Sequence, residues 1–175
     1  MLVEPPDPPL RAGAVLLRPF VGDDASAVAA ACQDADIPRF TFMKERLTEE
    51  QAREWIDRSN ERWSTGHARF AIVDQRDGRL LGQVGMSISD PHVSAEVYYW
   101  IASEARRAGV ASTALALLAD WAFDELGIER LYLLTHLENE ASQKLALRCG
   151  FTREGVLRGY QPFKGARPDF VSWSL

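Results

Sequence analysis

Residues 96–113, EVYYWIASEARRAGVAST, combine the residue types in this chain best suited to hold a charged ligand. The pattern predicts a strand that runs through a short polar loop into a helix beginning near Gly109. The first turn of a helix has free N–H groups and a partial positive charge, so a pyrophosphate can bind there. Gly109 permits close approach of the backbone, Ala111 is also small, and Arg106 and Arg107 add positive charge. The stretch therefore predicts a phosphate-binding loop.

The same loop also has a purely structural interpretation. A glycine between a strand and a helix is often only a turn, and paired arginines often only face solvent. The sequence contains neither G-x-G-x-x-G nor G-K-[ST], which argues against a dinucleotide fold and a nucleoside-triphosphate loop. If the loop binds phosphate, the ligand therefore belongs to another class.

The elements that must position this loop alternate between strands and helices. Asp77 and Gly78 predict a hairpin turn, and Thr48 with Gln51 has the spacing of a helix capping box. Strands are expected at residues 14–18, 69–73, 80–88, 93–101, 130–135, 152–158 and 170–174. Helices are expected from a cap at Asp23 or Asp24 to about Gln33, and at residues 48–66, 109–126 and 139–150. With no repeat and no break in composition, the order indicates one mixed α/β domain over residues 14–175.

Composition limits the classes of partner and compartment. The 175 residues fit a single domain, and the 46% of hydrophobic residues can bury a sizeable core. A formal net charge of -5 argues against nucleic acid as a partner. Residues 1–13 are rich in proline and lack the features of a signal peptide, so they are expected to form a flexible arm. No run of about 18 apolar residues exists, which argues against a membrane span.

Other residues of reactive types are given structural roles. Cys32 and Cys149 are too few for a disulfide framework, which favours a reducing, cytoplasmic location. His67, His92 and His136 lack metal-ligand spacing, so no metal is expected. The tryptophans on helical apolar faces are interpreted as core residues, and they are Trp55, Trp63 and Trp121.

Two motifs together resemble those of the GNAT superfamily of N-acetyltransferases. Residues 106–111 fit the loop pattern Q/R-x-x-G-x-G/A through Arg106, Gly109 and Ala111. Residues 139–151 contain N-x-x-S followed by G-F, which resembles the RimJ/RimL-type branch that acetylates protein amino termini. Similarity continues through Leu17-Arg18-Pro19 and residues 123–127, FDELG, so the resemblance covers nearly the whole chain.

The resemblance implies a fold and a cofactor site. The fold is a mixed, mostly antiparallel sheet of about seven strands, split by a V-shaped cleft and flanked by about four helices. Acetyl-CoA is the implied co-substrate, with pantetheine along the end of the strand at 100–102 and the pyrophosphate on the loop. The implied cofactor-binding residues are Trp100, Ile101, Ala102, Arg106, Arg107, Ala108, Gly109, Val110, Ala111, Ser112 and Asn139. Asn139 can equally be a helix N-cap.

The resemblance also implies catalytic roles. Glu96 is the candidate base for the amine, directly or through water, although an ordinary strand carboxylate is the alternative and the register decides which face it occupies. Ser142 is the candidate proton donor or thiolate stabiliser, or else only a first-turn serine. Many relatives carry a tyrosine four residues later as the proton donor, but this chain has Ala146 there. The resemblance therefore leaves Ser142 or solvent as the proton donor.

The acceptor is expected to be a primary amine, either a protein N-terminus or a small molecule, since a fold alone does not select it. By analogy, its pocket would involve Phe40, Phe42, Glu45 and Tyr160. A competing hypothesis is a non-catalytic acyl-CoA-binding or interaction module of the same fold. The resemblance also allows a homodimer, although no stretch of the sequence marks an interface.

Overall fold

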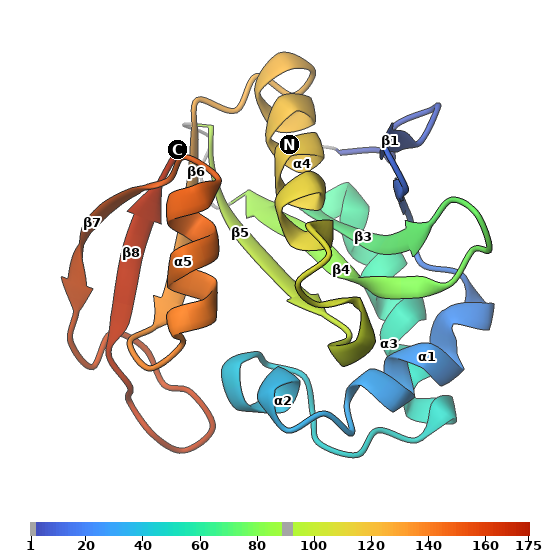
Figure 1. Cartoon of the computed structure of the whole chain (residues 1–175), viewed down its shortest axis with the longest axis horizontal. Coiled ribbons are helices and arrows are strands. Elements are labelled where there is room, and N and C mark those ends of the chain that lie inside the picture. The colour runs from blue at the N-terminus through green and yellow to red at the C-terminus, as the bar shows by residue number, and fades with distance from the viewer. Residues whose placement is uncertain (1–2, 89–92) are drawn as a thin grey trace.

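The protein folds around one eight-stranded sheet, described here from a computed structural model that covers residues 3–88 and 93–175 (Figure 1). The strand order is β1-β2-β3-β4-β5-β6-β8-β7, and only the β5–β6 pair is parallel. The strands are β1 (Leu10–Ala12), β2 (Val15–Arg18), β3 (His67–Asp74), β4 (Leu80–Ile88), β5 (Ser94–Ile101), β6 (Arg130–His136), β7 (Thr152–Leu157) and β8 (Phe170–Ser174). The mixed, mostly antiparallel sheet predicted from the sequence is confirmed.

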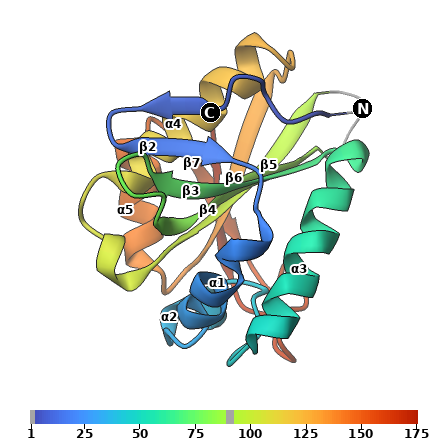
Figure 2. The same cartoon turned by 90° about the vertical axis from the view of Figure 1, so that its right-hand side faces the viewer.

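Helices cover both faces of the sheet, and Figure 2 shows the two layers edge-on. One layer holds α4 (Val110–Asp124) and α5 (Glu140–Arg148), and the other holds α1 (Ala25–Ala31), α2 (Asp36–Phe40) and α3 (Glu49–Glu61). Each layer buries its own apolar cluster, with Phe70 and Leu118 in the first and Val28 and Ile56 in the second. Within the described ranges, no helix is long and apolar enough to cross a membrane.

Local sequence signals explain where several elements begin. Thr48 caps α3 by accepting a hydrogen bond from the Gln51 amide at 3.2 Å, and the Gln51 side chain accepts one from the Thr48 amide at 3.0 Å. The β3–β4 hairpin turns at Gly78, whose φ of 73° suits glycine. Asp24 precedes α1 but does not cap it with its side chain. Its carboxylate instead pairs with Arg18 at 2.7 Å.

Two elements differ from the sequence prediction. The expected flexible arm at residues 1–13 contains β1, which pairs with β2, and Val3 is buried in the core. The sheet therefore has eight strands where about seven were expected. Helix α2 brings the number of α-helices in residues 3–88 and 93–175 to five, where about four were expected. It was missed because it is only five residues long and includes Pro38, which lies in its first turn, where amides need no helical partner.

The sheet opens between β5 and β6, which is the feature that matters most for the site. The two strands pair in parallel only from Ser94–Arg130 to Val97–Leu133. Beyond that point, residues 98–101 pair with β4 alone and residues 134–136 pair with β8 alone within the described part of the sheet. The V-shaped split expected from the resemblance is therefore present, and it exposes backbone groups that an added strand could satisfy.

Candidate active site

The α4 cavity, of about 660 Å³, lies at the start of α4 and extends to α2, the end of β5 and the start of α5. Its volume is within the range of small-molecule sites, roughly 300–1,000 Å³. Most of the residues predicted to bind cofactor, and the predicted catalytic serine, line it. They are Trp100, Ile101, Arg106, Arg107, Gly109, Val110, Ala111, Ser112, Asn139 and Ser142. Ala102 and Ala108 are not in this wall.

The loop before α4 is shaped so that backbone amides face the α4 cavity. Arg107 and Gly109 both adopt left-handed conformations, with φ of 62° and 77°, and Gly109 is the N-cap of α4. The Thr113 amide is bonded to the Gly109 carbonyl at 3.0 Å, so the amides of residues 110–112 precede the first helical hydrogen bond. A Cβ on Gly109 would meet nothing closer than the Ser112 hydroxyl, at 4.0 Å. This open, amide-lined helix end is suited to a diphosphate.

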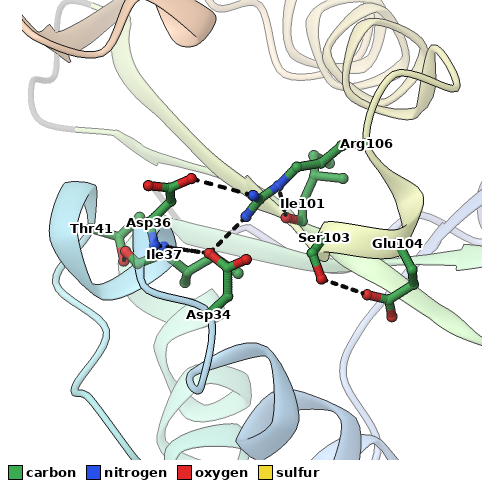
Figure 3. A network of polar contacts seen from close by, with 8 residues as sticks. All are labelled: Asp34, Asp36, Ile37, Thr41, Ile101, Ser103, Glu104 and Arg106. Carbon is green, nitrogen blue, oxygen red and sulfur yellow. Dashed lines mark hydrogen bonds and ion pairs between the residues drawn. The ribbon is translucent and has the colours of Figure 1, made fainter.

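The two loop arginines have different surroundings, as Figure 3 shows for Arg106. The Arg106 guanidinium donates to Asp34 at 2.9 Å and Asp36 at 3.4 Å, and its Nε donates to the Ile101 carbonyl at 3.2 Å. These contacts tie the loop to the segment that enters α2, and they hold the pKa of Asp34 below its usual range against the opposing effect of burial. Arg107 is exposed and has no ion pair within the described residues. Arg107 is therefore the more available cation for a bound anion.

Ser142 and Asn139 lie where the α4 cavity reaches the split sheet. The Asn139 side chain caps α5 by accepting a hydrogen bond from the Ser142 amide at 3.1 Å, so the N-cap interpretation is confirmed. The Ser142 hydroxyl shares a hydrogen bond of 2.6 Å with the Tyr99 hydroxyl. Burial raises the pKa of Tyr99 to about 12, although the bond to Ser142 lowers it in part. Tyr99 is therefore a protonated phenol at neutral pH and can donate to Ser142.

A second cavity, the α3 cavity, occupies about 470 Å³ on the side of the sheet that α3 covers. It is lined by strands β3 to β6, by residues 40–43 and by the β7–β8 connection. Lys164 of that connection donates to the backbone carbonyls of Pro38 and Met43, so the β7–β8 connection is bonded to the segment that forms another wall of the cavity. The two cavities share the following wall residues at the split: Phe40, Thr41, Tyr99, Trp100, Asn139 and Ser142.

The register of β5 places Glu96 in the α3 cavity. Glu96 shares a face of β5 with Trp100, which packs against the α1–α3 layer, while Tyr99 packs against the α4 layer. Burial raises the pKa of the Glu96 carboxyl above its ordinary value. No hydrogen bond or ion pair to Glu96 is present among the described residues. A half-buried carboxylate without a partner has the properties of a general base.

The outcome for the other residues considered from the sequence is mixed. Of the four residues predicted for the acceptor pocket, Phe40 and Phe42 line the α3 cavity, whereas Glu45 and Tyr160 line neither cavity. Trp55 is only partly buried and lines the α3 cavity, so its interpretation as a plain core residue is incomplete. His67 and His136 also line this cavity, whereas His92 lies outside the described residues. In the described part of the chain, no group of His, Cys, Asp or Glu could hold a metal ion.

Sequence reasoning missed the contact of Tyr99 with Ser142 and the position of Arg69 in the α3 cavity. The Tyr99 hydroxyl reaches Ser142 of α5, which is far from it in the sequence. Arg69 of β3 reaches the ring of Tyr98 of β5 across the one strand, β4, that lies between them. Strand alternation alone could have shown that Tyr99 and Glu96 face opposite sides of the sheet. It could not have shown which helix each face meets.

Comparison with known proteins places the chain among acetyltransferases. The family profile described as "Acetyltransferase (GNAT) domain" matches residues 14–152. The uncharacterized N-acetyltransferase YoaA of Bacillus subtilis (strain 168) is 29% identical over 170 residues, which is 96% of each chain. The spermidine N(1)-acetyltransferase of Escherichia coli (strain K12) is 28% identical over 149 residues, covering 83% of this chain and 77% of the relative. The structure of Mycobacterium smegmatis RimJ in complex with CoA-disulfide has a TM-score of 0.81 at 25% identity, covering 95% of this chain and 85% of that one.

Proposed function

The chain belongs to the GNAT acetyltransferase family, and from that premise we propose that it moves an acetyl group from acetyl-CoA to a primary amine by direct attack in a ternary complex. One observation carries the proposal. The α4 cavity and the α3 cavity open on opposite faces of the sheet and meet at the β5–β6 split, beside Tyr99 and Ser142. Two substrates that enter from opposite sides can therefore react at the split.

The α4 cavity fits the acyl donor. Free amides at the start of α4 and the exposed Arg107 suit the diphosphate, and the unpaired edge of β5 at residues 98–101 suits the amide-rich pantetheine. The α3 cavity is left for the acceptor amine. Acetyl-CoA supplies the activated thioester, and the residues of this chain supply position, a base and an acid.

Glu96 acts as the base in this proposal. An ammonium group must lose a proton before its nitrogen can attack a carbonyl carbon, and Glu96 receives that proton directly or through water. The raised pKa of Glu96 improves its match to an amine near neutral pH. An unpaired backbone amide of residues 98–101 can stabilise the oxyanion as the C–N bond forms.

Tyr99 and Ser142 supply the proton for the departing thiolate as the C–S bond breaks. Ser142 delivers its hydroxyl proton to sulfur and recovers one from Tyr99 along their 2.6 Å hydrogen bond. The second proton that the nitrogen loses as the amide forms returns to the Tyr99 phenolate through solvent, so the relay is restored and the net product is one released proton. The phenol of β5 thus replaces the helix tyrosine that the family often carries at the position of Ala146. Ala146 is fully buried and lines neither cavity, so this position supplies no acid to the site.

The proposed function is tested by free-thiol release from acetyl-CoA with a panel of amines, alongside calorimetry of CoA binding. Release that requires both acetyl-CoA and an amine supports the transferase. Tight CoA binding without thiol release from any amine would contradict it and identify a binding module of the same fold.

Ser142→Ala and Tyr99→Phe are each expected to lower kcat by about 100-fold, because either change breaks the same proton relay. The affinity for CoA is expected to stay within about twofold, since neither hydroxyl contacts the α4 loop. The double variant should be no slower than Ser142→Ala alone, because residues that act in series are not additive. Multiplied losses in the double variant, or two fully active single variants, would refute the relay.

A further inference from the structure

The end of the α3 cavity away from the split is basic. It holds Arg62, from the turn Arg62–Thr65 after α3, together with His67 and Arg69 of β3. The Arg62 guanidinium lies 2.8 Å from His67 Nε2, and the His67 Nδ1 lies 3.0 Å from the Ser87 hydroxyl. These groups form one connected polar wall at this end of the cavity.

Arg69 is held between two aromatic rings. Its guanidinium carbon lies 4.8 Å from the centroid of Trp55 and 5.4 Å from that of Tyr98. One terminal nitrogen donates to the Ser59 hydroxyl at 2.7 Å, which fixes the side chain against α3. Its Nε is buried and has no hydrogen-bond partner among the described residues. A guanidinium fixed in this way can offer its remaining terminal N–H groups to an acceptor oxygen in the cavity.

The sheet itself brings Arg69 and Tyr98 together. Gly85 of β4 lies directly between them in the pairing register, opposite Arg69 on one side and Tyr98 on the other. A Cβ on Gly85 would lie 2.8 Å from the Tyr98 ring, so only glycine lets the ring lie over β4 and reach Arg69. Glu96 lies two residues before Tyr98 on the same face of β5, in the stretch that still pairs with β6 just before the split.

The charges of the α3 cavity are unbalanced. Glu96 is its only carboxylate among the described lining residues, against the guanidinium groups of Arg62 and Arg69. No ion pair joins either arginine to a carboxylate in the described part of the chain, although eight other arginines, such as Arg18 and Arg130, have one. Burial, then Arg62 and Arg69, lower the pKa of His67, so the imidazole is neutral at physiological pH. The two arginines therefore supply an uncompensated positive potential.

We propose that Arg62 and Arg69 form an anion subsite, so that the acceptor is a small primary amine that also carries an oxyanion, a carboxylate or a phosphate. This inference rests on the proposed function and specifies its acceptor. The amine lies toward Glu96 and the split, the oxyanion lies on Arg62 and Arg69, and the aromatic walls of the α3 cavity enclose the body of the molecule. A polyamine is disfavoured because its several positive charges would face two arginines. In this respect the chain would differ from its spermidine-acetylating relatives.

The test compares matched amines that differ in the oxyanion, with the unmodified protein and acetyl-CoA, by thiol release corrected for the fraction of neutral amine. Phenylalanine is paired with phenethylamine and O-phosphoethanolamine with ethanolamine, which separates carboxylate from phosphate. Spermidine and a neutral tripeptide amide represent polyamines and protein termini. The anionic member of at least one pair is expected to have a kcat/KM higher by about tenfold or more.

Arg69→Gln and Arg62→Gln are the informative variants, and Arg58→Gln is the control, because Arg58 is exposed on α3 and outside the cavity. The anionic amine should lose about tenfold in kcat/KM through KM, while its neutral partner changes by less than about twofold. The CoA affinity and the melting temperature of each variant show whether it is correctly folded. Arg69 also donates a hydrogen bond to Ser59 of α3, so Arg69→Gln can destabilise the fold. If that variant does not fold, Arg62→Gln alone tests the anion subsite.

Three outcomes are distinguishable. Preference for the anionic amines, lost in the arginine variants, supports the subsite. Acetylation of spermidine, neutral amines or the tripeptide amide as fast as the anionic amines overturns the subsite but leaves the transferase intact. Absence of thiol release with every amine overturns the proposed function, and the subsite with it.

Discussion

Replacement of Gly109 by glutamate is expected to weaken CoA binding by more than about 100-fold while the protein still folds. A carboxylate at this position would stand at the amide-lined start of α4, where a diphosphate is proposed to bind. Hydrogen bonds to charged groups contribute about 1.5–3 kcal/mol each, so the loss of two accounts for this drop before repulsion is counted. The measurement is the dissociation constant of CoA by calorimetry.

Gly78→Glu is the matched control for this change. Gly78 has nearly the same left-handed φ, 73° against 77° for Gly109, and a Cβ on it would meet nothing within 4 Å, where one on Gly109 would meet only the Ser112 hydroxyl at 4.0 Å. Both variants therefore carry the same strain, roughly 1 kcal/mol for a non-glycine residue in this conformation. The control should keep the CoA affinity of the original protein. If Gly109→Glu also keeps it, the diphosphate does not bind at this loop.

Replacement of Glu96 by glutamine is expected to lower kcat/KM for the amine by about 10²- to 10⁴-fold, which is the usual contribution of a general base. The active form of Glu96 is the deprotonated one, so the rate should rise with pH as the carboxyl loses its proton. Burial moves this limb of the pH profile above the ordinary range of a glutamate. The limb should be absent in Glu96→Gln. A variant with nearly full activity and an unchanged limb would show that the base is another group.

The same substitution should raise stability. The pKa of Glu96 is higher in the folded than in the unfolded protein, so its contribution to stability is full below the unfolded pKa and declines as pH rises through the folded pKa. Glutamine does not titrate. Glu96→Gln should therefore melt at a higher temperature than the original protein near neutral pH, with the gap closing in acid. Glu129→Gln, an exposed change in the loop between α4 and β6, is the control and should leave both properties unchanged.

Features fixed by local chemistry could be predicted from the sequence. The start of α3 follows from the capping box of Thr48 and Gln51, and the loop before α4 follows from Gly109 between a strand and an amphipathic helix. Strand β1 could not be predicted, because three residues carry no period and the strand exists through its pairing with β2. Helix α2 is too short for the helical period to show.

The α3 cavity could not be predicted for a related reason. Its walls come from segments far apart in the chain, and only sheet register brings Arg69 over Gly85 to Tyr98. The ion-pair partners of Arg106 also could not be predicted from the sequence. Its spacing in the loop motif suggested a phosphate ligand, whereas its partners Asp34 and Asp36 come from a segment about 70 residues earlier in the chain.

A crystal structure of the protein with CoA tests the central claim most directly. The account predicts diphosphate oxygens within hydrogen-bond distance of the amides of residues 110–112, pantetheine along residues 98–101, and the sulfur beside Ser142. Density for CoA in any other place, with the start of α4 in contact only with solvent, would contradict the account.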